Sequence, residues 1–210
     1  MNLLRFFAEN RQQILELTLE HLWLVGISTQ LAVVVGIPLG IMSARWPAWN
    51  KPVLGTANII QTIPSLALFG FLLPVPWLGD RADRLAILAL TLYALLPIIR
   101  NTYTGIRGVD PAVVEAGRGM GLTTNQLLFQ VELPLASSVI VSGIRIAVVI
   151  SVGLATIAAA IGAGGLGEFI FRGLAMVNNQ LILAGAIPAA ILALSADFGL
   201  GWLERRLRPR

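Results

Sequence analysis

The side chains that usually carry enzymatic chemistry are scarce in this sequence. His21 is the only histidine and there is no cysteine, so no metal cluster and no Ser–His–Asp triad is expected, and we expect no catalytic residue and no cofactor. A G-x-G-x-x-G pattern falls at Gly162, Gly164 and Gly167, but no strand precedes it, which favours a tight turn at a membrane face over a dinucleotide site. The phosphate-binding pattern G-x-x-x-x-G-K-[ST] is absent, so the chain cannot hold and hydrolyse ATP by that route.

A second group of informative residues consists of polar side chains inside apolar runs. Between residues 53 and 73 the sequence contains Gln61, Thr62, Pro64 and Ser65. Polar groups are expensive at bilayer depth, and they face either a bundle interior or a watery path. The pattern therefore predicts a lining for a translocation path, with hydrogen bonding between helices as the alternative.

Two charges also lie inside apolar runs. Arg145 falls within residues 137–161 and Asp197 within residues 181–203, both toward the same side of the membrane. An unpaired charge in the hydrocarbon region is costly, so we expect these side chains to pair within about 6 Å, the range over which opposite charges shift each other. In the alternative, Arg145 extends to the lipid headgroups. His21, at the mouth of an apolar run, is expected at the interface.

The elements that must position these residues are membrane helices. Of 210 residues, 56% are hydrophobic and 12% are charged, whereas a soluble domain has roughly 25% charged residues. The arginines collect at the ends of apolar runs, as topology signals do, so the net charge of +4 indicates contact with membrane lipid and not with nucleic acid. We expect an all-α polytopic membrane protein in which residues 1–210 form a single domain.

Apolar runs of about 20 residues are long enough to cross a bilayer. They predict five transmembrane helices, at residues 21–43, 53–73, 85–99, 137–161 and 181–203. Residues 1–20 mix charged and apolar side chains, which favours a helix lying in the interface. Pro97 is expected to kink the third span near its end.

The longest polar interruption runs from Asp110 to Pro134 and predicts two short helices outside the membrane. Asp110 can cap the first, with Pro111 at its first position, and Gly119 or Gly121 can close it. Thr123 with Gln126 forms a capping box for the second helix. Pro134 is expected to end that helix.

The spacing within this interruption resembles the EAA loop of the permeases of ABC importers. Glu115-Ala116-Gly117, three residues, Gly121, nine residues and Val131-Glu132-Leu133-Pro134 correspond to E-A-A, three residues, G, nine residues and I-x-L-P, with Gly117 and Val131 as departures. The resemblance implies a cytoplasmic coupling loop over residues 106–134 that docks on a separate ATP-binding subunit. We expect Glu115, Ala116, Gly117 and Gly121 at that contact; the alternative is an amphipathic connector with a chance match.

The charge distribution predicts the same orientation as the resemblance. With the loop in the cytoplasm, the inner segments carry nine basic residues and the outer segments five, which agrees with the positive-inside rule. The N-terminus is then outside and the C-terminus inside. The inner residues are Arg45, Lys51, Arg100, Arg107, Arg118, Arg205, Arg206, Arg208 and Arg210, and the outer ones are Arg5, Arg11, Arg81, Arg84 and Arg172.

Two further stretches, residues 60–74 and 161–174, most resemble the permeases for glycine betaine, carnitine and choline. This resemblance implies a type I importer in a bacterial inner membrane. The expected partners are an ATP-binding subunit, a second permease subunit (a homodimer or a close paralogue) and an extracytoplasmic substrate-binding protein, separate because no such domain is fused to the chain. Two alternatives remain: import of methionine or another small amino acid, and a passive channel or scaffold without an ATPase.

Overall fold

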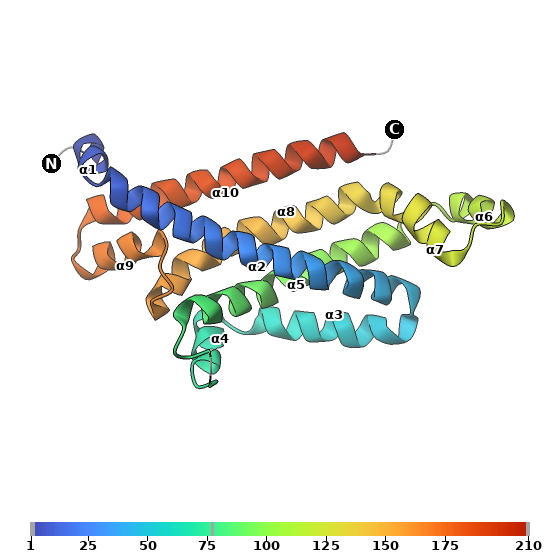
Figure 1. Ribbon diagram of the computed structural model, residues 1–210, viewed down its shortest axis with the longest axis horizontal. Helices are drawn as coiled ribbons and strands as arrows, with labels where there is room; N and C mark the ends of the chain where they lie inside the picture. The colour runs from blue at the N-terminus through green and yellow to red at the C-terminus, as the bar shows by residue number, and fades with distance from the viewer. Residues whose placement is uncertain (1–2, 77, 209–210) are drawn as a thin grey trace.

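The computed structural model describes residues 3–76 and 78–208, and every regular element in this part of the chain is helical. Four long helices run side by side (Figure 1), and each is apolar and long enough to cross a membrane. They are α2 (Arg11–Arg45), α5 (Ala82–Arg107), α8 (Leu133–Ala158) and α10 (Asn179–Leu207). The all-α, polytopic architecture expected from composition is therefore confirmed.

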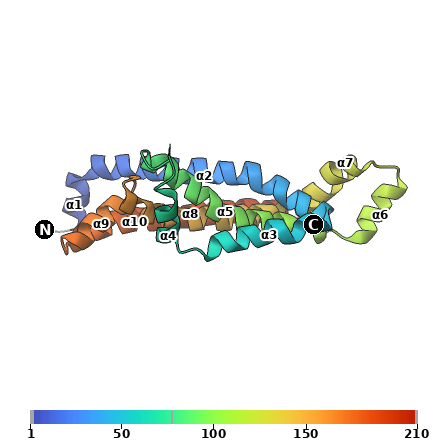
Figure 2. The same cartoon turned by 90° about the horizontal axis from the view of Figure 1, so that it is seen from below.

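Shorter helices lie between the long ones and at the two ends of the bundle. They are α1 (Leu3–Glu9), α3 (Pro47–Thr62), α4 (Ser65–Leu72), α6 (Pro111–Gly119), α7 (Thr124–Leu127) and α9 (Gly167–Ala175), with a π-helical turn at Leu128–Glu132 and a 3₁₀ turn at Ala159–Ile161. Helices α6 and α7 project beyond one end of the bundle, and α1 and α9 lie at the opposite end (Figures 1 and 2). The polar loop and the N-terminal helix are thus on opposite sides.

Helix α5 is the centre of the bundle and packs against both α2 and α8. Small residues allow this approach: a Cβ added to Gly40 of α2 would lie 2.5 Å from the Thr102 Cβ, and one added to Gly143 of α8 would lie 2.7 Å from the Pro97 carbonyl oxygen. Association of membrane helices depends on such close packing, because lipid tails are as apolar as the side chains themselves. The glycines therefore bring α2 and α8 onto one central helix.

The second span is broken, and the prediction of one helix over 53–73 was wrong. Helices α3 and α4 are bent by 100° relative to each other at Ile63–Pro64. Proline disfavours the helical conformation in the preceding residue, and Ile63 accordingly has an extended backbone with φ −72° and ψ 125°. Residues 3–76 and 78–208 therefore contain four long spans, and a fifth only if the bent pair counts as one.

Several boundaries also differ from the prediction. The third span does not end at residue 99, because α5 continues through Pro97 to Arg107. A break at Asn10 separates α1, and α2 then runs without interruption from Arg11, so half of the segment expected in the interface continues the first span. The two residues before Leu3 lie outside the described part of the chain.

At the end of the bundle opposite α6, the glycine-rich turn is present but short. Gly162, Gly164 and Gly165 all have φ near +82°, a left-handed conformation that favours glycine, and α9 follows directly. His21 was expected at the interface, but it is fully buried and its Nε2–H donates to the Val152 carbonyl at 3.1 Å. It therefore holds α2 against α8.

Candidate functional site

The first arm helix, α6, begins as the sequence predicts. The Asp110 carboxylate accepts the Ala112 N–H at 2.9 Å, and Pro111 occupies the first turn, where its missing N–H leaves no bond unmade. The last residue of α6 is Gly119, and Gly121, two residues further, has a left-handed φ of +83°. The Gly121 N–H donates to Arg118 O at 2.9 Å and the Leu122 N–H to Gly117 O at 3.2 Å, the two bonds of a Schellman motif. Gly121, not Gly119, is therefore the closing residue.

The second arm helix, α7, also begins as predicted, but it does not end where expected. The Thr123 N–H donates to Gln126 Oε1 at 2.8 Å and the Gln126 N–H to Thr123 Oγ1 at 3.4 Å, which completes the capping box. The helical path then continues through a π-helical turn into α8 and on to Ile161. Pro134 is tolerated because it falls in the first turn of α8, after the Leu133 N–H has bonded to Leu128 O.

Of the four residues expected at the contact with an ATP-binding subunit, Gly117 occupies a different position. It is buried inside the arm, and a Cβ there would lie 2.8 Å from Leu127 and 3.3 Å from Leu122. Its small size lets α6 pack on α7, so it shapes the arm from within. Glu115, Ala116 and Gly121 are exposed.

An apolar residue that the sequence analysis did not select, Met120, stands at the tip of the arm with 76% of its surface exposed. Val113, in the first turn of α6, is also exposed, at 43%. Because the arm projects beyond the bundle (Figure 2), these side chains lie outside the layer formed by the long helices. Exposed apolar groups at such a place are typical of a protein–protein contact.

The base of the arm is tied to α2 by an ion pair. Arg45 Nη2 donates to Glu132 Oε2 at 2.7 Å and to the Thr124 carbonyl at 3.3 Å. The side chain of Arg45 is 19% exposed and that of Glu132 is 9% exposed. Arg45 thus joins the end of α2 to the start of α7 and to the end of the π-helical turn that follows it.

Replacing Glu132 with glutamine should loosen the arm. Breaking a buried ion pair typically costs about 3–5 kcal/mol, and the exposure of Arg45 places this pair toward the lower value. Hydrogen exchange of the amides in residues 111–127 should become faster, while exchange in α5 stays unchanged. Glu9→Gln is the matched control, because Glu9 pairs with Arg5 at an exposed position at the far end. Equal protection of the arm in both variants would contradict a role for the pair.

The break in the second span is held by two reciprocal hydrogen bonds to α5. Pro97 has no N–H, which leaves the Tyr93 carbonyl without its helical partner. Gln61 Nε2 donates to this carbonyl at 3.0 Å, and the Tyr93 hydroxyl donates to the Ile63 carbonyl at the end of α3. Gln61 therefore takes part in hydrogen bonding between helices, the alternative left open by the sequence.

The other three residues expected along the path lie at the break itself. Thr62 Oγ1 donates to the Ile59 carbonyl at 2.7 Å, Pro64 caps α4, and Ser65 begins it. Thr62 and Pro64 are exposed on the surface of this chain. Irregular backbone at membrane depth is tolerated only where protein or a water-filled cavity covers it.

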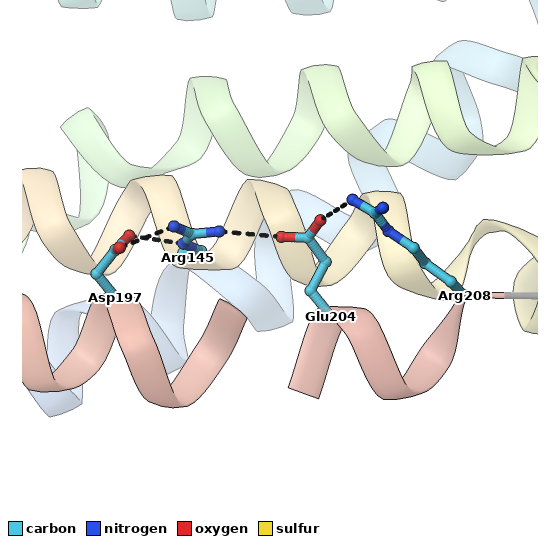
Figure 3. Close-up of polar contacts among 4 residues, drawn as sticks. All are labelled: Arg145, Asp197, Glu204 and Arg208. Carbon is cyan, nitrogen blue, oxygen red and sulfur yellow. Dashed lines mark hydrogen bonds and ion pairs between the residues drawn. The ribbon is translucent and has the colours of Figure 1, made fainter. Parts of the chain in front are cut away.

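The structure brings Arg145 and Asp197 together across α8 and α10. Arg145 Nε and Nη2 donate to the two Asp197 carboxylate oxygens at 2.6 and 2.7 Å, a bidentate pair. Figure 3 shows that Arg145 also reaches Glu204, at 3.3 Å, and that Glu204 in turn accepts from Arg208 at 3.1 Å. The charges alternate in sign, so each carboxylate has a cationic neighbour.

Four residues of these contacts were not selected from the sequence: Arg45, Glu132, Tyr93 and Glu204. Glu132 occupies the variable position x of the I-x-L-P part of the EAA motif. Arg45 lies at the end of an apolar run, where basic residues are common as topology signals. Glu204 lies seven residues, about two turns, beyond Asp197 and therefore on the same face of α10, a spacing that would have pointed to it once Arg145 was placed on α8. No local signal marks Tyr93, since its partners are 30 and 32 residues away.

The described part of the chain is thus a bundle of membrane-length helices with one broken span and a projecting two-helix arm. Residues 36–209 match the family described as binding-protein-dependent transport system inner membrane component, and the chain belongs to this family. It is thus an inner-membrane component of a binding-protein-dependent transport system, the family of ABC-importer permeases that the EAA loop indicated.

Relatives of known assignment cover nearly the whole chain. It is 47% identical over 98% of its length to the carnitine transport permease protein OpuCB of Listeria monocytogenes, covering 93% of that protein. It is 46% identical over 97% of its length to the glycine betaine/carnitine/choline transport system permease protein OpuCD of Bacillus subtilis, covering 88% of it. With the osmoprotectant import permease protein OsmW of Salmonella typhimurium the identity is 42%, over 100% of this chain and 99% of the relative.

Solved structures show the same fold at lower identity. The inward-facing MetNI methionine ABC transporter aligns with a TM-score of 0.81 and 24% identity, covering 90% of this chain and 94% of that one. An amino acid ABC transporter crystallised with histidines aligns with a TM-score of 0.74 and 19% identity, covering 98% and 99%. The type I importer permease fold is therefore confirmed.

Proposed function

We propose that this chain is the permease subunit of an ATP-driven importer for a small quaternary-ammonium osmoprotectant such as glycine betaine, carnitine or choline. The observation that carries the proposal is the 40–47% identity, over nearly the whole chain, to permeases named for these cargoes. The methionine and amino acid transporters share the fold at 24% identity or less. Import of methionine or another small amino acid is therefore the weaker candidate.

The arm is the element that receives work from the ATP-binding subunit. Glu115 and Ala116 face outward on α6, and Met120 and Gly121 form its exposed tip. The ion pair between Arg45 and Glu132 ties the α7 side of this arm to the end of α2. A passive channel or a scaffold would need no docking arm, and membership of the binding-protein-dependent transport family argues against both alternatives.

A second permease subunit completes the path in this proposal. The broken span exposes Thr62 and Pro64, and backbone of this kind must be covered by protein or border a water-filled cavity. Discontinuous helices also form the substrate sites of other transporter folds, where they lie at the interface between repeats. Two permease subunits that face each other across α3 and α4 would cover this backbone with protein and would place the break at the interface between them.

Replacing Ser65 with tryptophan should block uptake without preventing insertion or ATPase binding. Ser65 is half-buried at the start of α4, directly after the break, so an indole there projects into the proposed path. Leu66→Trp is the matched control: Leu66 is already 58% exposed on another side of the same helix, and uptake should be largely kept. Normal uptake by a normally expressed Ser65→Trp variant would remove the break from the path.

Affinity purification of the chain from its own membranes, with crosslinking, tests the assembly. The proposal expects an ATP-binding subunit and a substrate-binding protein to be recovered together with it. A ligand screen of that binding protein by calorimetry should then select quaternary ammonium compounds over methionine. Selection of methionine would transfer the assignment to the amino acid alternative, and recovery without an ATP-binding subunit would contradict the importer.

A further inference from the structure

A cavity of about 460 Å³ lies between the arm and the ends of α2 and α5. Its wall combines residues of the bundle with residues of α6, so a group inside it would contact the arm and the transmembrane part at once. Five charged residues line it: Arg45, Arg107, Arg118, Glu115 and Glu132. Apolar side chains, Ile106 and Val114 among them, complete the wall.

The charges in the cavity are not balanced. Arg45 and Glu132 neutralise each other at 2.7 Å. Within the described part of the chain, Arg107 and Arg118 have no carboxylate oxygen within 4.0 Å, and neither does Glu115 have a cationic nitrogen within that distance. The remaining charges are the two guanidinium groups of Arg107 and Arg118 and the one carboxylate of Glu115, so the cavity has one positive charge in excess.

Hydrogen-bond donors are in excess as well. The Nε of Arg45 is buried and makes no hydrogen bond, although a buried N–H is normally paired. Each guanidinium presents donors in a planar fork that fits the two oxygens of a carboxylate. The cavity therefore fits one anionic group with several acceptor oxygens and a short apolar stem.

We propose that this cavity receives an acidic side chain of the ATP-binding subunit when that subunit docks on the arm. The inference rests on the proposed function and adds the chemistry of the contact: an Asp or Glu of the partner, held by Arg107 and Arg118. Several residues of the wall, including Glu115 and Arg118, belong to the docking helix itself. A carboxylate entering from a docked subunit therefore reaches both guanidiniums, whereas a lipid headgroup would have to bring two acyl chains alongside this polar segment.

The first test measures the affinity of the purified ATP-binding subunit for the permease in nanodiscs of purely zwitterionic lipid. Arg107→Gln and Arg118→Gln should each weaken binding by about 10- to 100-fold, the effect of losing one charge-assisted hydrogen bond, and the loss should shrink as salt is raised. Arg205→Gln, an exposed cation outside the cavity near the end of α10, should leave the affinity unchanged. Unchanged affinity in both cavity variants overturns the inference, and absence of binding by the wild type would instead contradict the proposed function.

The second test identifies the carboxylate directly. The chain has a single lysine, Lys51, so Arg118→Lys adds one amine at the cavity while keeping the charge. A carbodiimide, which joins an amine and a carboxylate that are in contact, should then link the variant to one acidic residue of the ATP-binding subunit, found by mass spectrometry. The wild type should give no such link. A variant with no link to the partner, or an effect of Arg107→Gln that appears only in nanodiscs containing anionic lipid, overturns the inference in favour of an empty cavity or a lipid site.

Discussion

Replacing Gly121 with valine, or Glu115 with lysine, should give a chain that inserts and pairs normally but transports poorly. At φ +83° a β-branched residue is strained by about 1–3 kcal/mol, enough to open the Schellman motif and turn the tip of the arm. Glu115 is exposed on the same helix, so reversing its charge alters the docking surface without disturbing packing. Uptake and cargo-stimulated ATP hydrolysis should both fall by about tenfold or more.

The matched control is Gly119→Ala. Gly119 lies two residues earlier on α6, is exposed, has no atom within 4 Å of an added Cβ and does not have a positive φ. Alanine there should preserve transport, since it also favours the helix. If Gly121→Val and Glu115→Lys assemble correctly and keep full cargo-stimulated ATP hydrolysis, the arm does not dock on the ATPase. If the two variants only lower the yield of folded chain, these residues have a structural role in the loop and no role in docking.

Replacing Arg145 with leucine should destabilise the packing of α8 against α10. The substitution leaves Asp197 without a cation and removes one neighbour of Glu204, so two carboxylates lose a guanidinium between α8 and α10. A Cβ added to Gly201 would lie 3.1 Å from Arg145 Nη1, so the guanidinium also packs against the bare backbone of α10, a contact that leucine does not reproduce. The midpoint of thermal unfolding of the purified permease should fall by several degrees.

The double variant Arg145→Leu with Asp197→Leu separates pairing from packing. If the pair matters because an unpaired charge is costly, removing both charges should recover most of the lost stability, since Glu204 keeps Arg208. Arg205→Gln serves as the control for a cation of α10 outside the network. A double variant as unstable as Arg145→Leu alone would show that the shape of the side chains, and not their charge, holds α8 to α10.

The parts of the structure that sequence could predict depend on local rules. The Asp110 cap, the Thr123–Gln126 capping box and the left-handed Gly121 each involve residues within a few positions of one another. Span length and apolar composition likewise located the long helices. The approach of Arg145 to Asp197 could be expected across 52 residues only because an unpaired charge in a membrane leaves few alternatives.

Features that could not be predicted depend on contacts between distant segments. Pro134 was expected to end the second arm helix, but the helical path continues past it. The π-helical turn at Leu128–Glu132 precedes Pro134, which therefore falls in the first turn of α8. Pro97 was expected to kink the third span near its end at residue 99, but α5 continues to Arg107, and Gln61 of α3 donates to the Tyr93 carbonyl that Pro97 leaves without a helical partner. Gly117 was placed at the docking surface because its position in the motif was known and the direction in which it faces was not.

The central claim is that ATP hydrolysis on a separate subunit drives a quaternary ammonium compound through this chain. The most direct measurement is uptake of labelled glycine betaine, carnitine or choline by proteoliposomes containing the permease, its ATP-binding subunit and its binding protein. The proposed function predicts accumulation that requires ATP, that excess methionine does not inhibit, and that Glu115→Lys lowers by about tenfold or more. Equal uptake without ATP or without the ATP-binding subunit would contradict it, because a passive channel would then explain the transport.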